Sequence, residues 1–229
     1  MSMHLCIPPL EANVETSRRE NLDRWTLQLT RRLTRLLNGI SAHWLLLANL
    51  ALALYLGLPV LAPILRWAGH PRGADAIYLL FRPLCHQLPE RSFFLFGPQA
   101  VYSYEELSAF LGGGAVPQRY TGAPEIGFKI AICQRDVAIY GAMLLAGLLF
   151  GPLRRRIKPL PWRYFLALIL PLAIDGTGQL LGFWESTWWS RLLTGALFGV
   201  ACVWLAFPYL EEGMGEVHRE TSQALRDGS

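Results

Sequence analysis

Long apolar runs, separated by short polar segments, dominate the chain. A helix needs about 20 predominantly apolar residues to cross a bilayer, and four runs approach that length. They cover residues 44–67, 137–153, 164–183 and 192–210. Pro59 and Pro63 predict a bend near the end of the first run, whereas Asp175 and Gln179 interrupt the third. The pattern predicts an all-α membrane protein with four transmembrane helices.

A basic amphipathic segment precedes the first run. Between residues 18 and 39, leucines and one tryptophan recur every three or four positions. The residues expected at the membrane surface are Arg18, Arg19, Arg24, Trp25, Arg31, Arg32 and Arg35. The spacing predicts a helix that Gly39 ends and that lies in the headgroup layer; packing on a partner or on the bundle is the alternative. We expect disorder in the polar residues 1–17 and a charged tail over residues 211–229.

One further apolar stripe, over residues 73–88, is too short to span a bilayer and contains Arg82-Pro83. It predicts a short helix that re-enters the membrane or lies along its interface. The basic linker over residues 154–163 should face the cytoplasm, as should the N-terminal helix, and an even number of spans must then separate them. We therefore expect a plasma (inner) membrane protein with both termini in the cytoplasm.

This topology places residues 68–135 on the extracytoplasmic side as a small cap. Residues 91–98 are rich in strand-forming types before a Gly-Pro turn. Ser103 followed by Glu106 predicts a capping box at the start of a short helix. The cap is therefore expected to cover the outer end of the bundle without forming an independent domain.

Composition and charge agree with a membrane protein. The chain has 229 residues, of which 52% are hydrophobic and 17% charged, and this is more apolar than an average soluble domain. Its net charge of +4 comes from basic clusters that flank the apolar runs and form no nucleic-acid-reading module. The expected partners are the lipid bilayer and other membrane subunits, and no nucleic acid.

Asp175 needs an explanation, because an ionised carboxylate near mid-bilayer costs about 2.5–3.5 kcal/mol on insertion scales. Gln179, four residues later, shares its helix face. Arg135 and Arg191 lie at the ends of neighbouring runs and are the available counter-charges. One interpretation is an ion pair that holds helices together. The other is a polar pocket in which Asp175 and Asp136 accept protons or bind a metal.

Cys85 and Cys133 flank the cap, and three interpretations of them stay open. A disulfide would suit an oxidising exterior. A transition-metal site would combine both thiols with His86 and with Asp136 or Asp175, a ligand set that suits zinc, iron or copper. A reactive thiol or redox pair is the third interpretation.

Cys85 and His86 are neighbours in the sequence, and this limits how they could bind one metal ion. Neighbouring residues of a helix diverge in direction by about 100°, so Cys85 and His86 can share one ion only where the helix is broken. Pro83 and Pro89 make such a break credible. The chain has no CxxC pair, which excludes a thioredoxin-like motif and a zinc ribbon.

Four separated motifs carry a resemblance to a known family. They are Cys85-His86-Gln87 with Arg91-Ser92-Phe93, Cys133-Gln134-Arg135 leading to Tyr140-Gly141, Pro171 with Asp175-Gly176-Thr177-Gly178-Gln179, and Arg191 with Thr194-Gly195. In this order, over residues 75–200, they resemble the predicted integral membrane proteins called "domain of unknown function 2085". The resemblance implies a multi-pass membrane protein without an established activity. It also groups the polar residues Gln87, Arg91, Arg135, Gln179 and Arg191 with the thiols as one site.

Three hypotheses about function follow. The first is an outward-facing Cys/His/Asp metal site that serves metal handling or a metal-assisted reaction on a membrane-soluble substrate. The second is a non-enzymatic subunit or scaffold, with a Cys85–Cys133 disulfide and an ion pair from Asp175 to an arginine. The third, a small transporter or channel, is the least favoured because the spans lack a second run of polar residues. The sequence leaves enzymatic activity open.

Overall fold

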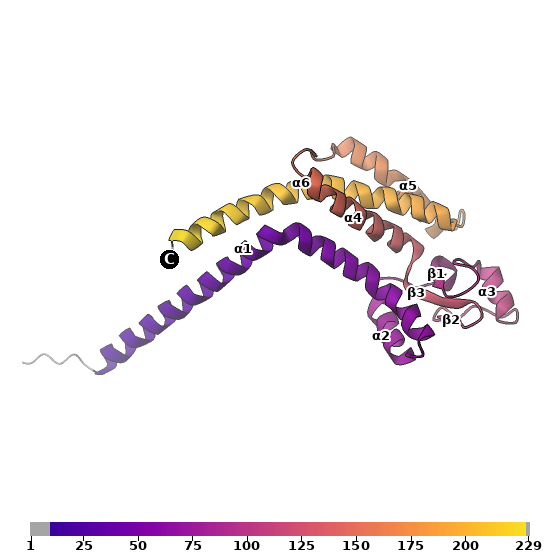
Figure 1. Ribbon diagram of the computed structural model, residues 1–229, viewed down its shortest axis with the longest axis horizontal. Helices are drawn as coiled ribbons and strands as arrows, with labels where there is room; N and C mark the ends of the chain where they lie inside the picture. The colour runs from indigo at the N-terminus through magenta and orange to yellow at the C-terminus, as the bar shows by residue number, and fades with distance from the viewer. Residues whose placement is uncertain (1–9, 228–229) are drawn as a thin grey trace, which may run out of the picture. The chain divides into compact units, whose positions relative to one another are not determined.

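A computed structural model describes residues 10–227 of the chain, and the side chains from residue 24 to residue 227. The α-helices are α1 (Leu10–Trp67), α2 (Pro71–Phe81), α3 (Tyr104–Phe110), α4 (Gln134–Leu153), α5 (Trp162–Leu180) and α6 (Trp188–Asp227) (Figure 1). A short 3-10 helix, η1 (Pro89–Arg91), and the strands β1 (Ser92–Leu95), β2 (Gly122–Ala123) and β3 (Gly127–Cys133) complete the described elements. Of the segment expected to be disordered, residues 10–17 are helical, and residues 1–9 lie outside the described part.

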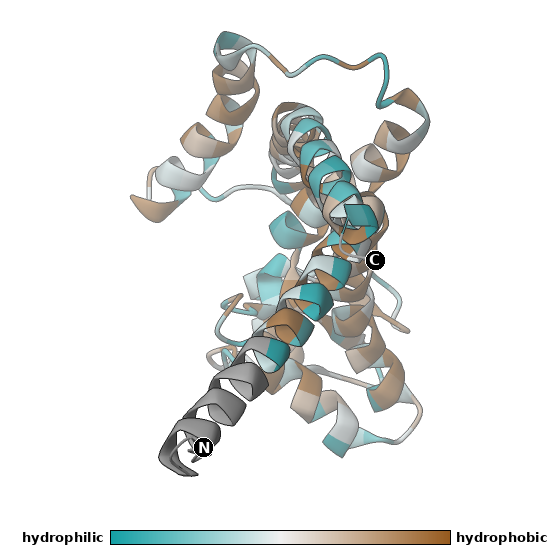
Figure 2. Cartoon of the chain, turned by 90° about the vertical axis from the view of Figure 1, so that its left-hand side faces the viewer, coloured by the Kyte–Doolittle hydropathy of each residue, from teal (hydrophilic) through white to brown (hydrophobic). Residues whose placement is uncertain are grey.

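Within the described residues, three helices are long and apolar enough to cross a membrane. They are Arg24–Trp67 within α1, Gln134–Leu153 and Trp188–Asp227. The predicted third span forms α5, a helix of 19 residues, but is not among them, because Arg163, Asp175 and Gln179 lower its hydropathy. The expected count of four spans is therefore confirmed for three helices only. Figure 2 shows the apolar residues along the helices in brown and the hydrophilic end of α6, near the C label, in teal.

The chain divides into two compact units, and the first contains the residues up to Trp44 and those from Glu212 onward. Here α1 continues through Gly39, so the predicted helix end is wrong; the backbone leaves helical geometry at His43, with φ −119° and ψ 17°. Asn38 joins the two chain segments, because its Oδ1 accepts hydrogen bonds from Thr221 Oγ1 (3.0 Å) and Ser222 Oγ (2.8 Å). The charged tail is thus part of a helix that reaches Asp227.

The second unit, residues 45–211, contains the candidate spans and residues 68–135, the segment predicted as a cap and called the cap below. Small residues allow α4 and α6 to pack closely. A Cβ on Gly199 would lie 2.3 Å from the Ile139 carbonyl oxygen, and one on Gly195 would lie 2.9 Å from the Cβ of Ala138. Neither glycine can therefore be replaced without separating the two helices.

The cap contains a three-stranded antiparallel sheet in the order β1-β3-β2. The predicted strand around residues 92–95 and the capping box are confirmed: Glu106 N donates to Ser103 Oγ (3.1 Å), and Ser103 N donates to Glu106 Oε2 (2.7 Å). The sequence did not predict β3, because its almost continuous apolar residues resemble the start of the following helix. This strand makes the fold mostly helical rather than all-α.

The end of β3 positions the site. Ser92 of β1 pairs with Cys133, and Cys133 is in turn the N-cap residue of α4. Buried residues of α2 and β3, including Tyr78, Phe81 and Ile130, form a hydrophobic core beside this junction. The sheet therefore fixes where α4 begins and where its first polar residues lie.

Candidate functional site

A cavity of about 330 Å³ gathers residues from the motif segments. Its polar lining comes from the turn after α2, from η1, from the junction of β3 with α4, and from the facing ends of α5 and α6. These residues are Cys85, His86, Gln87, Arg91, Cys133, Arg135, Asp136, Gln179 and Arg191. Segments separated by more than a hundred residues in the sequence thus share one cavity.

Two thiols and one carboxylate converge at one side of the cavity. The ligand atoms of Cys85, Cys133 and Asp136 all lie within 4.8 Å of one another. Asp136 lies in the first turn of α4, three residues after Cys133, where residues at this spacing are neighbours on a helix. Both thiols are free, so the disulfide, one of the three interpretations of this pair, is not supported: the sulfur atoms lie within 4.8 Å of one another without a covalent bond.

The contact between the two thiols shifts their pKa values in opposite directions. The hydrogen bond to Cys133, together with burial, raises the pKa of the Cys85 thiol. The same hydrogen bond lowers the pKa of the Cys133 thiol, which also stands at the positive end of a 20-residue helix. Cys133 is therefore the first of the two to become a thiolate.

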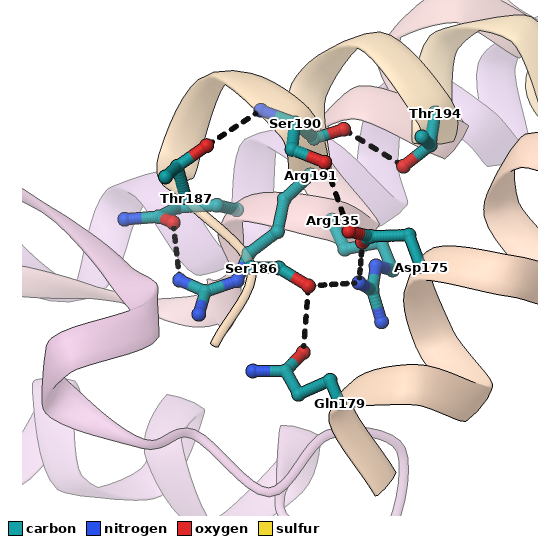
Figure 3. A network of polar contacts seen from close by, with 9 residues as sticks. Arg135, Asp175, Gln179, Ser186, Thr187, Ser190, Arg191 and Thr194 are labelled. Atoms are coloured by element: carbon teal, nitrogen blue, oxygen red, sulfur yellow. Dashed lines mark hydrogen bonds and ion pairs between the residues drawn. The ribbon is translucent and has the colours of Figure 1, made fainter. Parts of the chain in front are cut away.

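His86 and Asp175 lie outside this group. His86 is exposed and lines the same cavity. Both carboxylate oxygens of Asp175 already have donors: Arg135 Nη2 lies 2.5 Å from Oδ2, and Ser190 Oγ lies 2.9 Å from Oδ1 (Figure 3). Of the two arginines that the sequence offered as counter-charges, Asp175 contacts Arg135.

Ser186 extends this network toward the cavity. Arg135 Nη2 donates to Ser186 Oγ (3.5 Å), and Ser186 Oγ lies 3.3 Å from the side-chain amide of Gln179 (Figure 3). When the Gln179 amide is turned so that its oxygen faces the arginines, that oxygen accepts from Arg191 Nη2 (3.2 Å) and Arg91 Nη2 (3.0 Å). The Gln179 amide therefore lies between Ser186, which contacts the ion-paired Arg135, and the two arginines Arg91 and Arg191.

Arg191 is held by a glutamine rather than by a carboxylate. Arg191 is 8% exposed, and its Nη1 donates to Gln134 Oε1 (3.1 Å). Gln134 Nε2 donates in turn to the Ser92 carbonyl (3.2 Å). This chain of contacts ties the start of α6 to the β1–β3 ladder.

Comparison with known proteins agrees with the arrangement of motifs. Residues 126–205 match a family described as predicted membrane protein (DUF2085). Uncharacterized protein MJ1492 of Methanocaldococcus jannaschii is 30% identical over 140 residues, which cover 59% of this chain and 69% of that protein. The chain belongs to the DUF2085 family. The predicted family is thus confirmed over a range that contains three of the four motifs, and no solved structure matches the chain.

The residues matched to DUF2085 include part of the cavity. They contain Cys133, Arg135 and Asp136 at the start of α4, together with the cavity residues of α5 and α6. Cys85 and Arg91 come before the matched range. The cavity of this DUF2085 protein is therefore completed by the segment that precedes the match.

Sequence reasoning missed several polar residues of this DUF2085 site. Gln134, Ser186 and Ser190 carry no charge, so they raise no insertion penalty that would single them out. Lys129 is 1% exposed within β3, and its Nζ donates to the carbonyl of Gln87. A lysine inside an apolar run was a usable signal, because lysine is almost never fully buried without a partner.

The turn that presents Cys85 and His86 is held in place by Gln87. Gln87 has a positive φ of 54°, which is uncommon for a residue other than glycine. Its Nε2 donates to the Tyr78 carbonyl (2.8 Å), and the Tyr78 hydroxyl donates to the Lys129 carbonyl (2.5 Å). Burial lowers the pKa of Lys129 to about 8.

Proposed function

We propose that this protein binds a transition-metal ion through Cys85, Cys133 and Asp136, and that it acts in metal handling or in a metal-assisted reaction on a membrane-soluble substrate. The observation that carries the proposal is the convergence of three ligand atoms within 4.8 Å of one another at the wall of a cavity. Two thiolates and a carboxylate suit zinc, iron or copper.

The carboxylate favours a metal over a redox pair or a bare reactive thiol. The negative charge of Asp136 close to both thiols opposes the formation of two thiolates in the absence of a cation. A bound divalent cation would reverse this effect, because it stabilises all three anionic ligands at once. The arrangement therefore suits an ion better than it suits an unassisted nucleophile.

His86 supplies a candidate fourth ligand. Residues 85–88 are not helical, so the 100° divergence of helical neighbours does not apply to Cys85 and His86. The exposed imidazole and the adjoining cavity leave room for a water molecule or substrate, and an open coordination position is typical of catalytic rather than structural zinc.

We place the site at the extracytoplasmic end of a four-span bundle in the plasma membrane, with α5 as the fourth span and both termini in the cytoplasm. Pairing with Arg135 reduces the penalty for inserting Asp175. Trp25 and Leu33, at 65% and 50% exposure, suit a helix whose apolar face enters the headgroup layer.

Elemental analysis of protein purified under reducing conditions tests the metal site. We expect near-stoichiometric metal in the wild type and its loss in Cys133→Ser and Asp136→Asn, with a smaller loss in His86→Ala. Cys202→Ser is the matched control, because Cys202 is a free thiol within α6 that does not line the cavity. Metal-free wild-type protein after metal supplementation would end the proposal.

A non-enzymatic role as a membrane-complex subunit is the second candidate. The Arg135–Asp175 pair, with Ser190, joins the ends of α4, α5 and α6, as a purely structural site would. Chemical cross-linking in native membranes tests this role. A partner subunit recovered with the metal-free Cys133→Ser variant as efficiently as with the wild type would favour it.

A further inference from the structure

We propose that the cavity also contains an oxyanion site, formed by Arg91, Arg191 and Gln179, that takes the phosphate group of a lipid or of a soluble phosphate ester. The proposal goes beyond the metal site, because it uses other side chains and needs no metal ion. Its basis is the uncompensated charge of two arginines that line one cavity.

Arg191 is the clearest sign of an absent anion. It is 8% exposed, and its Nε is buried without a hydrogen-bond partner. Among the described residues, ion pairs within 4.0 Å join Arg66, Arg135 and Arg154 to carboxylates, and neither Arg91 nor Arg191 takes part in one. Buried guanidinium groups are normally paired, whereas Asp175 and Cys133, the negative groups that act on Arg191, form no direct ion pair with it.

Arg91 and Arg191 face the same space from different elements. Arg91 ends η1 and Arg191 lies in the first turn of α6. Their Nη2 atoms lie 3.0 and 3.2 Å from the same amide atom of Gln179. Two like charges this close repel one another, and an anion between them would replace that repulsion with two charge-assisted hydrogen bonds.

The other charges of the cavity do not cancel this pair. Arg135 is neutralised by Asp175. Asp136 lines the cavity but groups with the thiols. Without a metal ion, the arginines Arg91, Arg135 and Arg191 and the aspartates Asp136 and Asp175 leave one net positive charge, which an anionic phosphate group would neutralise.

Apolar residues beside the arginines add a place for a hydrocarbon chain. Leu84 and Leu180 line the same cavity and are 60% and 85% exposed. A lipid phosphate could place its headgroup against the arginines and its chains over these leucines. A soluble phosphate ester would contact the arginines alone. Both ligands therefore bind through the phosphate group, and only the lipid also contacts Leu84 and Leu180.

Isothermal titration calorimetry on the full-length protein in detergent micelles tests the proposal. The probes are glycerol 3-phosphate and dihexanoyl phosphatidic acid, with uncharged dioctanoylglycerol as the blank. We expect at least one phosphate probe to bind, and binding to weaken at least about tenfold in Arg91→Gln and in Arg191→Gln, since each substitution removes a charge-assisted hydrogen bond. Arg82→Gln is the control, because Arg82 is exposed and lines a different cavity.

The outcomes separate the alternatives. Binding of both probes, or of the soluble ester alone, assigns the site to the phosphate group itself, whereas binding of the lipid alone assigns it to a membrane lipid. Absence of binding by both probes overturns the proposal, as does equal binding by the wild type and a folded Arg91→Gln variant. Arg91 is half-buried, so this variant serves if Arg191→Gln does not fold.

The metal proposal can fail separately. Protein stripped with EDTA should bind phosphate as well as untreated protein does. Binding that appears only after metal loading would place the phosphate on the ion and overturn the arginine site. Phosphate binding by protein that takes up no metal would leave the arginine site standing and end the metal site alone.

Discussion

Arg135 and Arg191 line the same cavity, yet the protein satisfies their charges in different ways. Arg135, whose side chain is 23% exposed, forms an ion pair with Asp175, which is held further by Ser190. Arg191, at 8% exposure, is hydrogen-bonded to the neutral amides of Gln134 and Gln179 and forms no ion pair with a carboxylate within 4.0 Å. A buried charge that is neutralised within the chain holds helices together, whereas one without a counter-charge marks where a ligand completes the structure.

The same comparison applies to the groups of the cavity that can carry a negative charge. Cys85, Cys133 and Asp136 are possible anions, and among the ion pairs within 4.0 Å in the described part of the chain none involves Asp136. The wall formed by the thiols and Asp136 therefore suits a cation, and the wall formed by Arg91 and Arg191 suits an anion. The network around Asp175 is neutralised within the chain and requires no ligand. Substitutions in the network should affect stability, and substitutions at the cavity walls should affect ligand binding.

The largest effect should come from Asp175→Ala. It leaves the Arg135 charge without its partner, and breaking a buried pair typically costs about 3–5 kcal/mol. We expect that loss in the free energy of unfolding, measured by titrating mixed detergent micelles with SDS. Removing both charges, in Arg135→Met with Asp175→Ala, should recover a large part of the loss.

Asp75→Ala is the matched control for this prediction. It breaks the Arg66–Asp75 pair, whose side chains are 27% and 59% exposed, and exposed pairs contribute about 0.2–1 kcal/mol. If Asp175→Ala were no more destabilising than Asp75→Ala, the network would not hold the helix ends together as described.

A smaller effect is expected for Gln134→Leu. The substitution removes the acceptor of Arg191 Nη1 and the donor to the Ser92 carbonyl, and each unsatisfied buried group costs about 1–3 kcal/mol. The same SDS titration measures the loss. Gln118→Leu, at an exposed position of the cap, should have little effect; equal losses in the two variants would exclude a structural role for the Gln134 contacts.

The smallest effect should be the pH dependence that Lys129 gives to the cap. Burial lowers the pKa of Lys129 from 10.5 to about 8, so between these values the unfolded chain binds the additional proton. Stability should therefore rise as the pH rises through 8, by about 1 kcal/mol between pH 7 and pH 9.

Thermal unfolding at several pH values, compared between the wild type and Lys129→Met, measures this dependence. Glu90 and Cys85 lie near enough to oppose the shift, and His86 and Arg82 share the adjoining cavity. The difference between the two proteins isolates the lysine from these groups. Identical pH profiles would show that Lys129 does not titrate in this range.

The sequence predicted those features of the fold that local pattern decides. The apolar runs located the helices, and the Ser103–Glu106 spacing located a capped helix. The strand β3 was missed because its pairing with β1 depends on a partner more than thirty residues away, which no local period reveals. The helical tail was missed because contacts such as those of Asn38 with Thr221 and Ser222 join opposite ends of the chain.

The candidate site was partly predictable for an energetic reason. Thiols, arginines and Asp175 stand out beside apolar runs because placing polar or charged groups in a membrane costs free energy. The cavity brings most of them together. Which of them pair could not be predicted, since Asp175 had two possible arginines and the choice depends on how the ends of α4 and α6 pack. Neutral partners such as Gln134 and Ser190 carry no such signal.

X-ray absorption spectroscopy of the metal-loaded protein tests the central claim most directly. The account predicts two sulfur scatterers at about 2.3 Å from a zinc ion and oxygen or nitrogen at about 2.0–2.2 Å, with one sulfur lost in Cys133→Ser. A metal bound with no sulfur in its first coordination shell would contradict the assignment of Cys85 and Cys133 as ligands.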